Sequence, residues 1–224
     1  MAKRNLVIVG ASAFAEVAWL YFKEGGKYNI KGFSVEKKYL EQTRMFGLPV
    51  VPFEEIEKAF PPNDHDVFVA VVYTEMNRLR TRLMNESEAK GYVLASYISD
   101  KAFVASNVEI GKHCFIFENN VIQPFTKIGS NSILWSGNHI GHHSKIENNC
   151  FISSHVVISG YSVIKSNVFM GVNSSCADTI IIEKNNWIGP NCCITRNTQP
   201  DQIFRATPAE ASKISSLRFF KVKD

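Results

Sequence analysis

The chain has 224 residues, of which 45% are hydrophobic and 21% are charged, as expected for one large or two small globular domains. The formal net charge of +4 is modest. Lys and Arg are scattered, without a basic run that carries interleaved aromatic residues, so the composition argues against a nucleic-acid partner. The longest apolar stretch, residues 67–73, is far shorter than the roughly 20 residues that cross a bilayer. No membrane span is predicted.

The N-terminus places Lys3 and Arg4 before a short apolar segment, residues 6–9, as a signal peptide does. Because this segment is shorter than the roughly 7 to 15 apolar residues of such a peptide, we predict a buried strand instead. A helix at 13–22, ended by Gly25 and Gly26, and a strand at 28–35 follow. The next elements are predicted as a strand at 49–51, a helix at 53–60, a strand at 66–73, a helix at 76–91 and a strand at 93–98.

This alternation of strands and helices predicts a small Rossmann-like βαβ domain with a parallel sheet over residues 1–97. The turn after its first strand lies where dinucleotide folds place G-x-G-x-x-G/A. Gly10 and Ala15 fit that pattern, whereas Ser12 replaces its second glycine. Such a turn presents amides and a helix N-terminus to a phosphate. The expected substrate-binding residues are Gly10, Ser12, Ala13, Phe14 and, after the second strand, Glu36. The alternative is a purely structural turn.

From residue 98 onward an apolar residue falls on every sixth position without interruption, a spacing that neither an ordinary strand nor a helix produces. The series is Ile98, Val104, Ile110, Ile116, Ile122, Ile128, Leu134, Ile140, Ile146, Ile152, Ile158, Ile164, Met170, Cys176, Ile182, Ile188 and Ile194. The fifth place of each hexad mostly holds a compact side chain, and turns rich in Asn, Gly and Ser separate the short strands. This pattern predicts a parallel β-helix whose coils stack on one another.

The hexads resemble those of the left-handed β-helix acyltransferases, and the left hand is implied only by that resemblance. An N-terminal nucleotide-binding-like domain followed by such a β-helix is similar to the bacterial sugar acetyltransferases, including sialic-acid O-acetyltransferase and the bacillosamine-pathway N-acetyltransferase. The implied domains are residues 1–97, a β-helix at 98–200 and a capping tail at 201–224. Cys114, Cys150 and Cys192 fall on the compact position. The cysteines therefore indicate core residues of a cytoplasmic protein rather than half-cystines.

Histidines cluster between residues 139 and 155, at His139, His142, His143 and His155. The stretch from Gly137 to Gly160 resembles, in register, the family segment that carries the catalytic base. This resemblance implies that His142 is the base and that the Gly160 amide is the oxyanion donor. A solvated turn and a zinc site built from these histidines are the alternatives, and no metal is expected.

The residue after the base is acidic in the family but is His143 here. Residues eighteen apart stack on neighbouring coils, and the positions stacked on His142 carry no carboxylate. The expected partner of its second ring nitrogen is therefore a backbone carbonyl, Gln123, Asn138 or a group from another subunit.

The C-terminal segment resembles the Gly-x-Pro-Ala-Lys close of many hexapeptide acyltransferases, which lies beside the coenzyme A site. This resemblance implies that Pro208, Ala209 and Lys213, together with Gly160, bind the coenzyme. The tail after residue 200 is expected to cover the open end of the last coil.

Together these features predict an acetyl-CoA-dependent N-acetyltransferase that acts on an amino sugar, a nucleotide-linked 4-amino sugar used for bacterial surface glycans. The alternatives are a sialic-acid or sugar O-acetyltransferase and a non-catalytic β-helix scaffold. Apolar residues at outward positions of the hexads indicate an interface, and the family also implies a homotrimer. These residues are Phe115, Phe117, Val121, Ile133, Trp135, Phe151, Val157, Val163, Phe169, Ile181 and Trp187.

Overall fold

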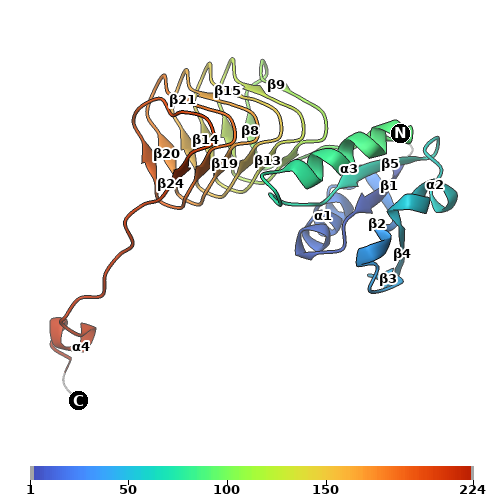
Figure 1. Ribbon diagram of the computed structural model, residues 1–224, viewed down its shortest axis with the longest axis horizontal. Helices are drawn as coiled ribbons and strands as arrows, with labels where there is room; N and C mark the ends of the chain where they lie inside the picture. Colours follow the sequence, from blue (N-terminus) through green and yellow to red (C-terminus); the bar gives the residue numbers. More distant parts are fainter. Residues whose placement is uncertain (1–2, 223–224) are drawn as a thin grey trace.

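The computed structural model describes residues 3–222 and consists of a βαβ domain, a β-helix and an extended C-terminal tail (Figure 1). The βαβ domain is built on a sheet with strand order β3-β4-β2-β1-β5-β6. Its pairs are parallel except for the hairpin of β3 and β4. The elements are β1 (Arg4–Val9), α1 (Ala13–Glu24), β2 (Tyr28–Val35), η1 (Lys37–Tyr39), β3 (Arg44–Met45), β4 (Leu48–Pro52), η2 (Phe53–Glu55), α2 (Ile56–Ala59), β5 (His65–Val69), α3 (Arg78–Ala89) and β6 (Val93–Leu94).

Two predicted strands are shorter than expected. The strand predicted at 66–73 ends at Val69, because the chain then turns toward the β-helix, where Tyr73 packs edge-on against Phe151 and Phe169. The strand predicted at 93–98 is divided between two sheets. Its first part, β6, pairs with β5, whereas its second part, β7, begins the β-helix.

Alternation along β1 explains why the sheet of the βαβ domain is buried on both faces. Leu6 and Ile8 point into a core shared with α1 and the β-helix, whereas Val7 and Val9 point into a second core with α2 and α3. Side chains of a strand alternate between faces, so two helical layers require apolar residues at every position. All four side chains are buried.

The β-helix consists of two-residue strands that stack in three parallel sheets, eighteen residues apart except for the last pair, in which Trp187 lies opposite Ile203. The docked sheet contains β7 (Tyr97–Ile98), β10 (Phe115–Ile116), β13 (Ile133–Leu134), β16 (Phe151–Ile152), β19 (Phe169–Met170), β22 (Trp187–Ile188) and β24 (Ile203–Phe204). The open sheet contains β8 (Phe103–Val104), β11 (Val121–Ile122), β14 (His139–Ile140), β17 (Val157–Ile158), β20 (Ser175–Cys176) and β23 (Cys193–Ile194). The charged sheet contains β9 (Glu109–Ile110), β12 (Lys127–Ile128), β15 (Lys145–Ile146), β18 (Val163–Ile164) and β21 (Ile181–Ile182).

The hexad pattern builds the core of the β-helix as predicted. The apolar position from Ile116 onward is buried, and so is the compact position from Cys114 onward. Polar residues at the compact position are accommodated by hydrogen bonds to the turns; for example, the Asn120 amide donates to the carbonyls of Phe117 and Trp135 at 2.9 and 2.8 Å. Four of the cysteines are buried and Cys193 is exposed, and all five are free thiols.

The βαβ domain packs on the docked sheet, and this contact uses most of the outward apolar residues that had indicated an oligomer. Phe115 contacts Phe14 and Phe22 of α1, with ring centroids 5.6 and 5.7 Å apart. The other members of this shared core are Phe117, Ile133, Phe151 and Phe169, with Trp135 and Trp187 partly buried beside them. The sequence places these residues outward correctly but does not reveal which surface covers them.

A buried polar cluster also joins the two domains. The Val69 amide donates to Nε2 of His113 at 2.9 Å, and Nδ1 of His113 lies 2.8 Å from Oδ1 of Asn131. Arg80 of α3 donates to the carbonyls of Val69 and His113. Burial, with the charge of Arg80 as the second cause, holds the pKa of His113 well below its ordinary value. Burial also lowers the pKa of Arg80 to about 9.

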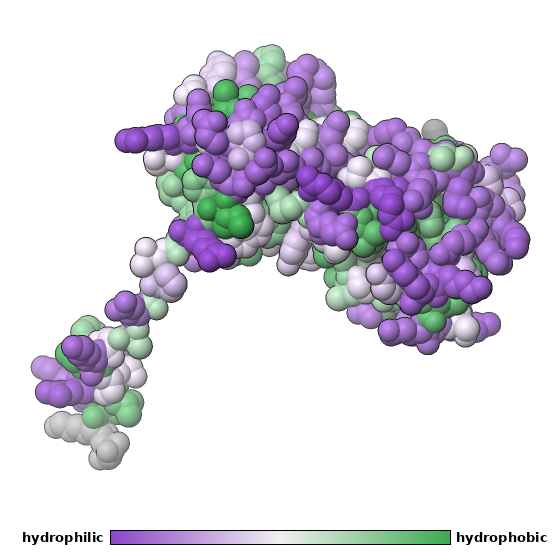
Figure 2. Space-filling view, in the orientation of Figure 1, coloured by the Kyte–Doolittle hydropathy of each residue, from purple (hydrophilic) through white to green (hydrophobic). Residues whose placement is uncertain are grey.

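The C-terminal tail covers the last coil only with its first residues, since Phe204 and Ala206 pack against the core of the β-helix. The β-helix continues past residue 200, because β24 (Ile203–Phe204) pairs with β22. Residues beyond it are mostly exposed and run away from the last coil to a short helix, α4 (Ser216–Phe219) (Figure 1). Apolar surface is visible around α4 (Figure 2). Within residues 3–222, none of the helices has the length and apolar character needed to traverse a bilayer.

Candidate active site

His142 lies in the turn between β14 of the open sheet and β15 of the charged sheet, exposed at the surface of the chain. Its imidazole lies against Gly160 of the next coil. A Cβ atom at Gly160 would lie only 3.1 Å from Cε1 and 3.2 Å from Nε2 of His142. A larger residue at position 160 would therefore displace the ring. The sequence places His142 and Gly160 together, and the structure adds a steric reason for the glycine.

The hydrogen bonds of His142 differ from those expected. Its backbone amide, not its ring, donates to Oε1 of Gln123 at 2.9 Å. Asn138 is occupied elsewhere, since its side chain donates to the Trp135 carbonyl and accepts from the Val156 amide. The ring nitrogen Nδ1 of His142 lies 3.1 Å from Nδ1 of His143. The partner of the candidate base is thus the residue that stands at the acidic position of the family.

Phe125 and Tyr161 flank His143 on the coils before and after it. The ring of His143 stacks on Phe125, with centroids 4.6 Å apart and planes at 23°, and on Tyr161, at 4.7 Å and 14°. Tyr161 also meets His142 edge-on at 5.2 Å. Our sequence analysis missed this column, although the spacing of eighteen residues between its members was a signal that it stacks.

The amide of Gly160 is free beside the imidazole. The amides of His142 and Ser166 donate to side chains nineteen residues earlier, Gln123 and Glu147. The corresponding residue for position 160 is Gly141, which has no side chain. Among the hydrogen bonds of residues 3–222, none uses the Gly160 amide as a donor. An amide that has no acceptor within the chain is available as a donor for an anionic oxygen.

The other clustered histidines lie apart from this pair. His139 is on the outer face of the open sheet, and His155 lies over Gly137 in the turn between the docked and open sheets. Across residues 3–222, no three His, Cys, Asp or Glu side chains are grouped as metal ligands are. The four histidines named for the zinc alternative therefore do not converge within the chain.

A second candidate site is a cleft of about 590 Å³ at the carboxyl ends of β1 and β2. Gly10, Ser12 and Glu36 line it, as do Tyr39 and Thr74, which our sequence analysis did not select. Ligands bind in such a position in open parallel sheets, beside the N-terminus of the first helix. The backbone also requires glycine at position 10, because its φ is 133° and a Cβ atom there would lie 2.6 Å from the carbonyl oxygen of Ala70.

Not all predicted residues reach this cleft. Phe14 is buried in the shared core against Phe68 and Phe115, so its side chain has a packing role. Ala13 begins α1 and is exposed, but it does not line the cleft. Glu36 does line it, and its carboxylate pairs with Arg82 of α3 at 3.0 Å. The cleft thus contains three of the five predicted substrate-binding residues.

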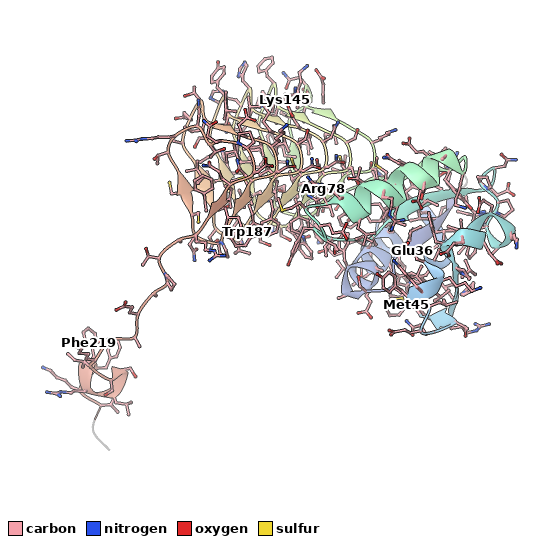
Figure 3. The ribbon with its side chains drawn as sticks, viewed as in Figure 1. Glu36, Met45, Arg78, Lys145, Trp187 and Phe219 are labelled. Atoms are coloured by element: carbon pink, nitrogen blue, oxygen red, sulfur yellow. The ribbon has the colours of Figure 1, made fainter. Side chains whose placement is uncertain are left out.

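The residues predicted to bind coenzyme A do not come together in one chain. Pro208, Ala209 and Lys213 are exposed on the tail, away from the β-helix. The cleft belongs to the βαβ domain, whereas His142 lies on the β-helix. Lys145 is on the strand that follows the His142 turn, and Figure 3 shows it at the edge of the β-helix that faces away from the βαβ domain. Glu36, which lines the cleft, is labelled in the βαβ domain.

Comparisons with known proteins agree with this architecture. The bacterial transferase hexapeptide (six repeats) family profile matches residues 107–142 and 125–160. No curated protein matches the sequence. Among solved structures, the acetyltransferase domain of PglB from Neisseria gonorrhoeae superposes with a TM-score of 0.81 at 21% identity, covering 90% of this chain and 96% of that chain.

Two further structures extend the comparison. One is a histidine-to-asparagine mutant of perosamine N-acetyltransferase from Caulobacter crescentus in complex with CoA and GDP-perosamine. It superposes with a TM-score of 0.80 at 19% identity, and the match covers 90% of this chain and 93% of that chain. WeeI from Acinetobacter baumannii gives a TM-score of 0.61 at 20% identity, and the match covers 88% of this chain and 94% of that chain. The chain thus carries bacterial transferase hexapeptide repeats and has the two-domain fold of these acetyltransferases, a Rossmann-like βαβ domain followed by a left-handed β-helix.

Proposed function

We propose that the protein transfers the acetyl group of acetyl-CoA to the amino group of a nucleotide-linked sugar. The observation that carries this proposal is the imidazole of His142 lying against Gly160, whose amide donates no hydrogen bond within the described residues, on a hexapeptide β-helix. Similar structures that contain CoA and GDP-perosamine, or acetyl coenzyme A, support the choice of both substrates.

The two groups suit the two tasks of this reaction. The amine nitrogen attacks the thioester carbonyl carbon, and the carbonyl oxygen becomes an anion that the Gly160 amide stabilises. Nε2 of His142 accepts the proton that the nitrogen loses as the C–N bond forms. The C–S bond then breaks, and the coenzyme A thiolate leaves and takes up the proton from His142. The products are the N-acetylated sugar nucleotide and coenzyme A.

We propose that the cleft of the βαβ domain holds the nucleotide. The first amides of α1 have no partner within the helix and favour a phosphate beside Ser12. Apolar side chains from β1, β2, β4 and α3, among them Val9, Val35 and Leu79, line the rest of the cleft and suit the flat face of a base.

The cleft lies on the βαβ domain and His142 on the β-helix, and this separation favours a site shared between subunits. We propose a homotrimer in which the cleft of one subunit supplies the acceptor to His142 of its neighbour, with Pro208, Ala209 and Lys213 contacting the coenzyme across the same boundary. The His142 turn borders the open sheet, whose outer face carries the exposed side chains of Phe103, Val121 and Val157. A cytoplasmic location follows from these two substrates.

An acetyl-transfer assay tests the proposal. Purified protein is incubated with acetyl-CoA and a thiol reagent against nucleotide-linked 4-amino sugars, their unlinked sugars and sialic acid. We expect thiol release and a product heavier by one acetyl group only with a nucleotide-linked amino sugar. Transfer to a sialic-acid hydroxyl would favour the O-acetyltransferase alternative. Absence of transfer to every acceptor would favour a non-catalytic scaffold.

A substitution at Ser12 tests the nucleotide site separately. The phenol ring of Ser12→Tyr would occupy the cleft next to Gly10, so we expect the KM for the sugar nucleotide to rise at least tenfold while the KM for acetyl-CoA is unchanged. Ser12→Ala is the matched control and should keep both values. An unchanged KM for the sugar nucleotide in Ser12→Tyr would leave the turn with a structural role alone.

A further inference from the structure

The column formed by Phe125, His143 and Tyr161 holds the partner of the candidate base in a fixed plane. His143 lies between two aromatic rings that are nearly parallel to its own, at 4.6 and 4.7 Å. Each member comes from a different coil, and the coils are joined by backbone hydrogen bonds, such as that from the His143 amide to the Pro124 carbonyl at 3.1 Å. Rotation of the His143 ring would therefore break two stacking contacts.

The backbone of this column makes its composition unusual. Phe125, His143 and Tyr161 have φ values of 63°, 60° and 56°, in the left-handed region that disfavours bulky side chains. The equivalent residues in the other turns are mostly Asn, as at Asn131 and Asn149. Asn adopts this conformation more readily, so aromatic residues here accept a backbone cost. Such costs concentrate at functional sites.

The direction of the hydrogen bond between the two histidines decides which ring nitrogen of His142 is basic. The Nδ1 atoms lie 3.1 Å apart, so one of them carries the hydrogen and the other accepts it. If His142 donates, its Nε2 has a free lone pair. If His143 donates, Nε2 of a neutral His142 carries a hydrogen and the ring cannot accept a proton there.

We propose that His143 is a neutral positioning residue whose Nδ1 accepts the Nδ1–H of His142, so that Nε2 of His142 is the atom that takes the proton from the acceptor. This inference rests on the proposed function, because it concerns the base of that reaction. When Nε2 becomes protonated, the hydrogen bond to His143 gains charge assistance and strengthens. An interaction that strengthens as the reaction proceeds lowers the barrier.

Two substitutions of His143 distinguish its role as a hydrogen-bond acceptor from its role in filling the space between Phe125 and Tyr161. His143→Asn keeps an acceptor, because Oδ1 of Asn is bonded to Cγ as Nδ1 of His is, and Asn tolerates the left-handed turn. His143→Leu fills the column but accepts no hydrogen bond. The ¹⁵N chemical shifts of the imidazole nitrogens report the tautomer of each histidine. The signals of His142 are assigned as those that are missing from the spectrum of His142→Asn. The signals of His139 and His155 serve as internal controls.

We expect His142 of the wild type and of His143→Asn to carry its hydrogen on Nδ1, and His142 of His143→Leu to lose this preference. A wild-type His142 with its hydrogen on Nε2 would overturn the inference.

In the acetyl-transfer assay, His143→Leu should lower kcat about tenfold with an unchanged KM for both substrates, and His143→Asn should recover most of that loss. Equal kcat values for all three proteins would also overturn it. The tautomer needs no substrate, so the absence of transfer in the wild type would refute the proposed function while the spectrum still decides the role of His143.

Discussion

At the scale of single residues, the site depends on which atoms the coils bring within a few ångströms. A Cβ atom at Gly160 would lie 3.1 Å from the imidazole of His142, so the ring would have to move by a few tenths of an ångström to accommodate a side chain there. The Gly160 amide donates no hydrogen bond within the described residues, whereas the amide of His142 donates to the side chain of Gln123. The imidazole of His142 and a backbone donor are thus both available at Gly160.

Replacing the candidate base gives the most direct test at this scale. His142→Asn removes the atom that accepts the proton, so we expect kcat to fall by roughly 10²- to 10⁴-fold, the usual contribution of a positioned general base. The KM for acetyl-CoA should change little, since that substrate is not held by the imidazole. Steady-state kinetics on the accepted sugar nucleotide measures both. Wild-type turnover in this variant would show that another residue is the base.

The sequence predicted some residues of the site better than others. Resemblance over 137–160 selected His142 and Gly160, and the structure brings them into contact. The role of His143 as partner was missed, because the contact depends on side-chain rotamers and on the stacking of Phe125 and Tyr161. Phe14 was selected from the turn motif, although its helical spacing with Ala18 and Phe22 already indicated a core residue.

At the scale of elements, a period of six predicted nearly every strand of the β-helix, because each hexad is one side of a coil and its register is fixed by the core. The period does not reveal what covers an outward face. Phe115 and Phe151 were assigned to an oligomer interface, but they pack under α1 and the loop after β5. Contacts between domains depend on the complete fold and have no local pattern in the sequence.

The buried cluster between α3 and the β-helix predicts a pH-dependent stability. Because the pKa of His113 is depressed in the native state, the unfolded chain binds a proton there below about pH 6.5 while the native protein does not. Stability is therefore present above that pH and is lost as the pH falls. Between pH 7.5 and 5.5 we expect His113 to account for a decrease on the order of 1 kcal/mol in the free energy of unfolding.

Urea unfolding of the wild type and of His113→Asn at both pH values measures this contribution. Asn is a suitable replacement because Asn131 and Asn149 occupy the same turn position on the next coils, with positive φ like His113. The variant should be less stable at pH 7.5 but should lose less stability between the two pH values, by an amount on the order of 1 kcal/mol. The same decrease in both proteins would show that His113 titrates normally in the native state.

At the scale of the whole molecule, the three sheets of the β-helix have different surroundings. The docked sheet lies under the βαβ domain, and the charged sheet presents Glu109, Lys127 and Lys145 to solvent, with Lys127 paired to Glu109 at 2.8 Å. The open sheet carries Phe103 and Val157, which are 60% and 42% exposed, without a covering element in the described chain. A neighbouring subunit is therefore expected on the open sheet, which borders the turn of His142.

The proposed trimer gives a measurable mass and a way to disrupt it. Three copies of the 25.2 kDa chain correspond to about 76 kDa, which light scattering at micromolar concentration should report.

Val157→Glu places a charge at the centre of the expected interface, where burial of an unpaired carboxylate costs several kcal/mol, so we expect it to shift the mass toward 25.2 kDa. Val172→Glu is the matched control, because Val172 is similarly exposed, at 44%, but lies in the turn between the docked and open sheets. A monomeric wild type would refute the trimer, and equal masses for the two variants would refute the open sheet as its interface. Because the cleft and His142 lie apart in one chain, a dissociated Val157→Glu should also lose acetyl transfer while it still binds the sugar nucleotide.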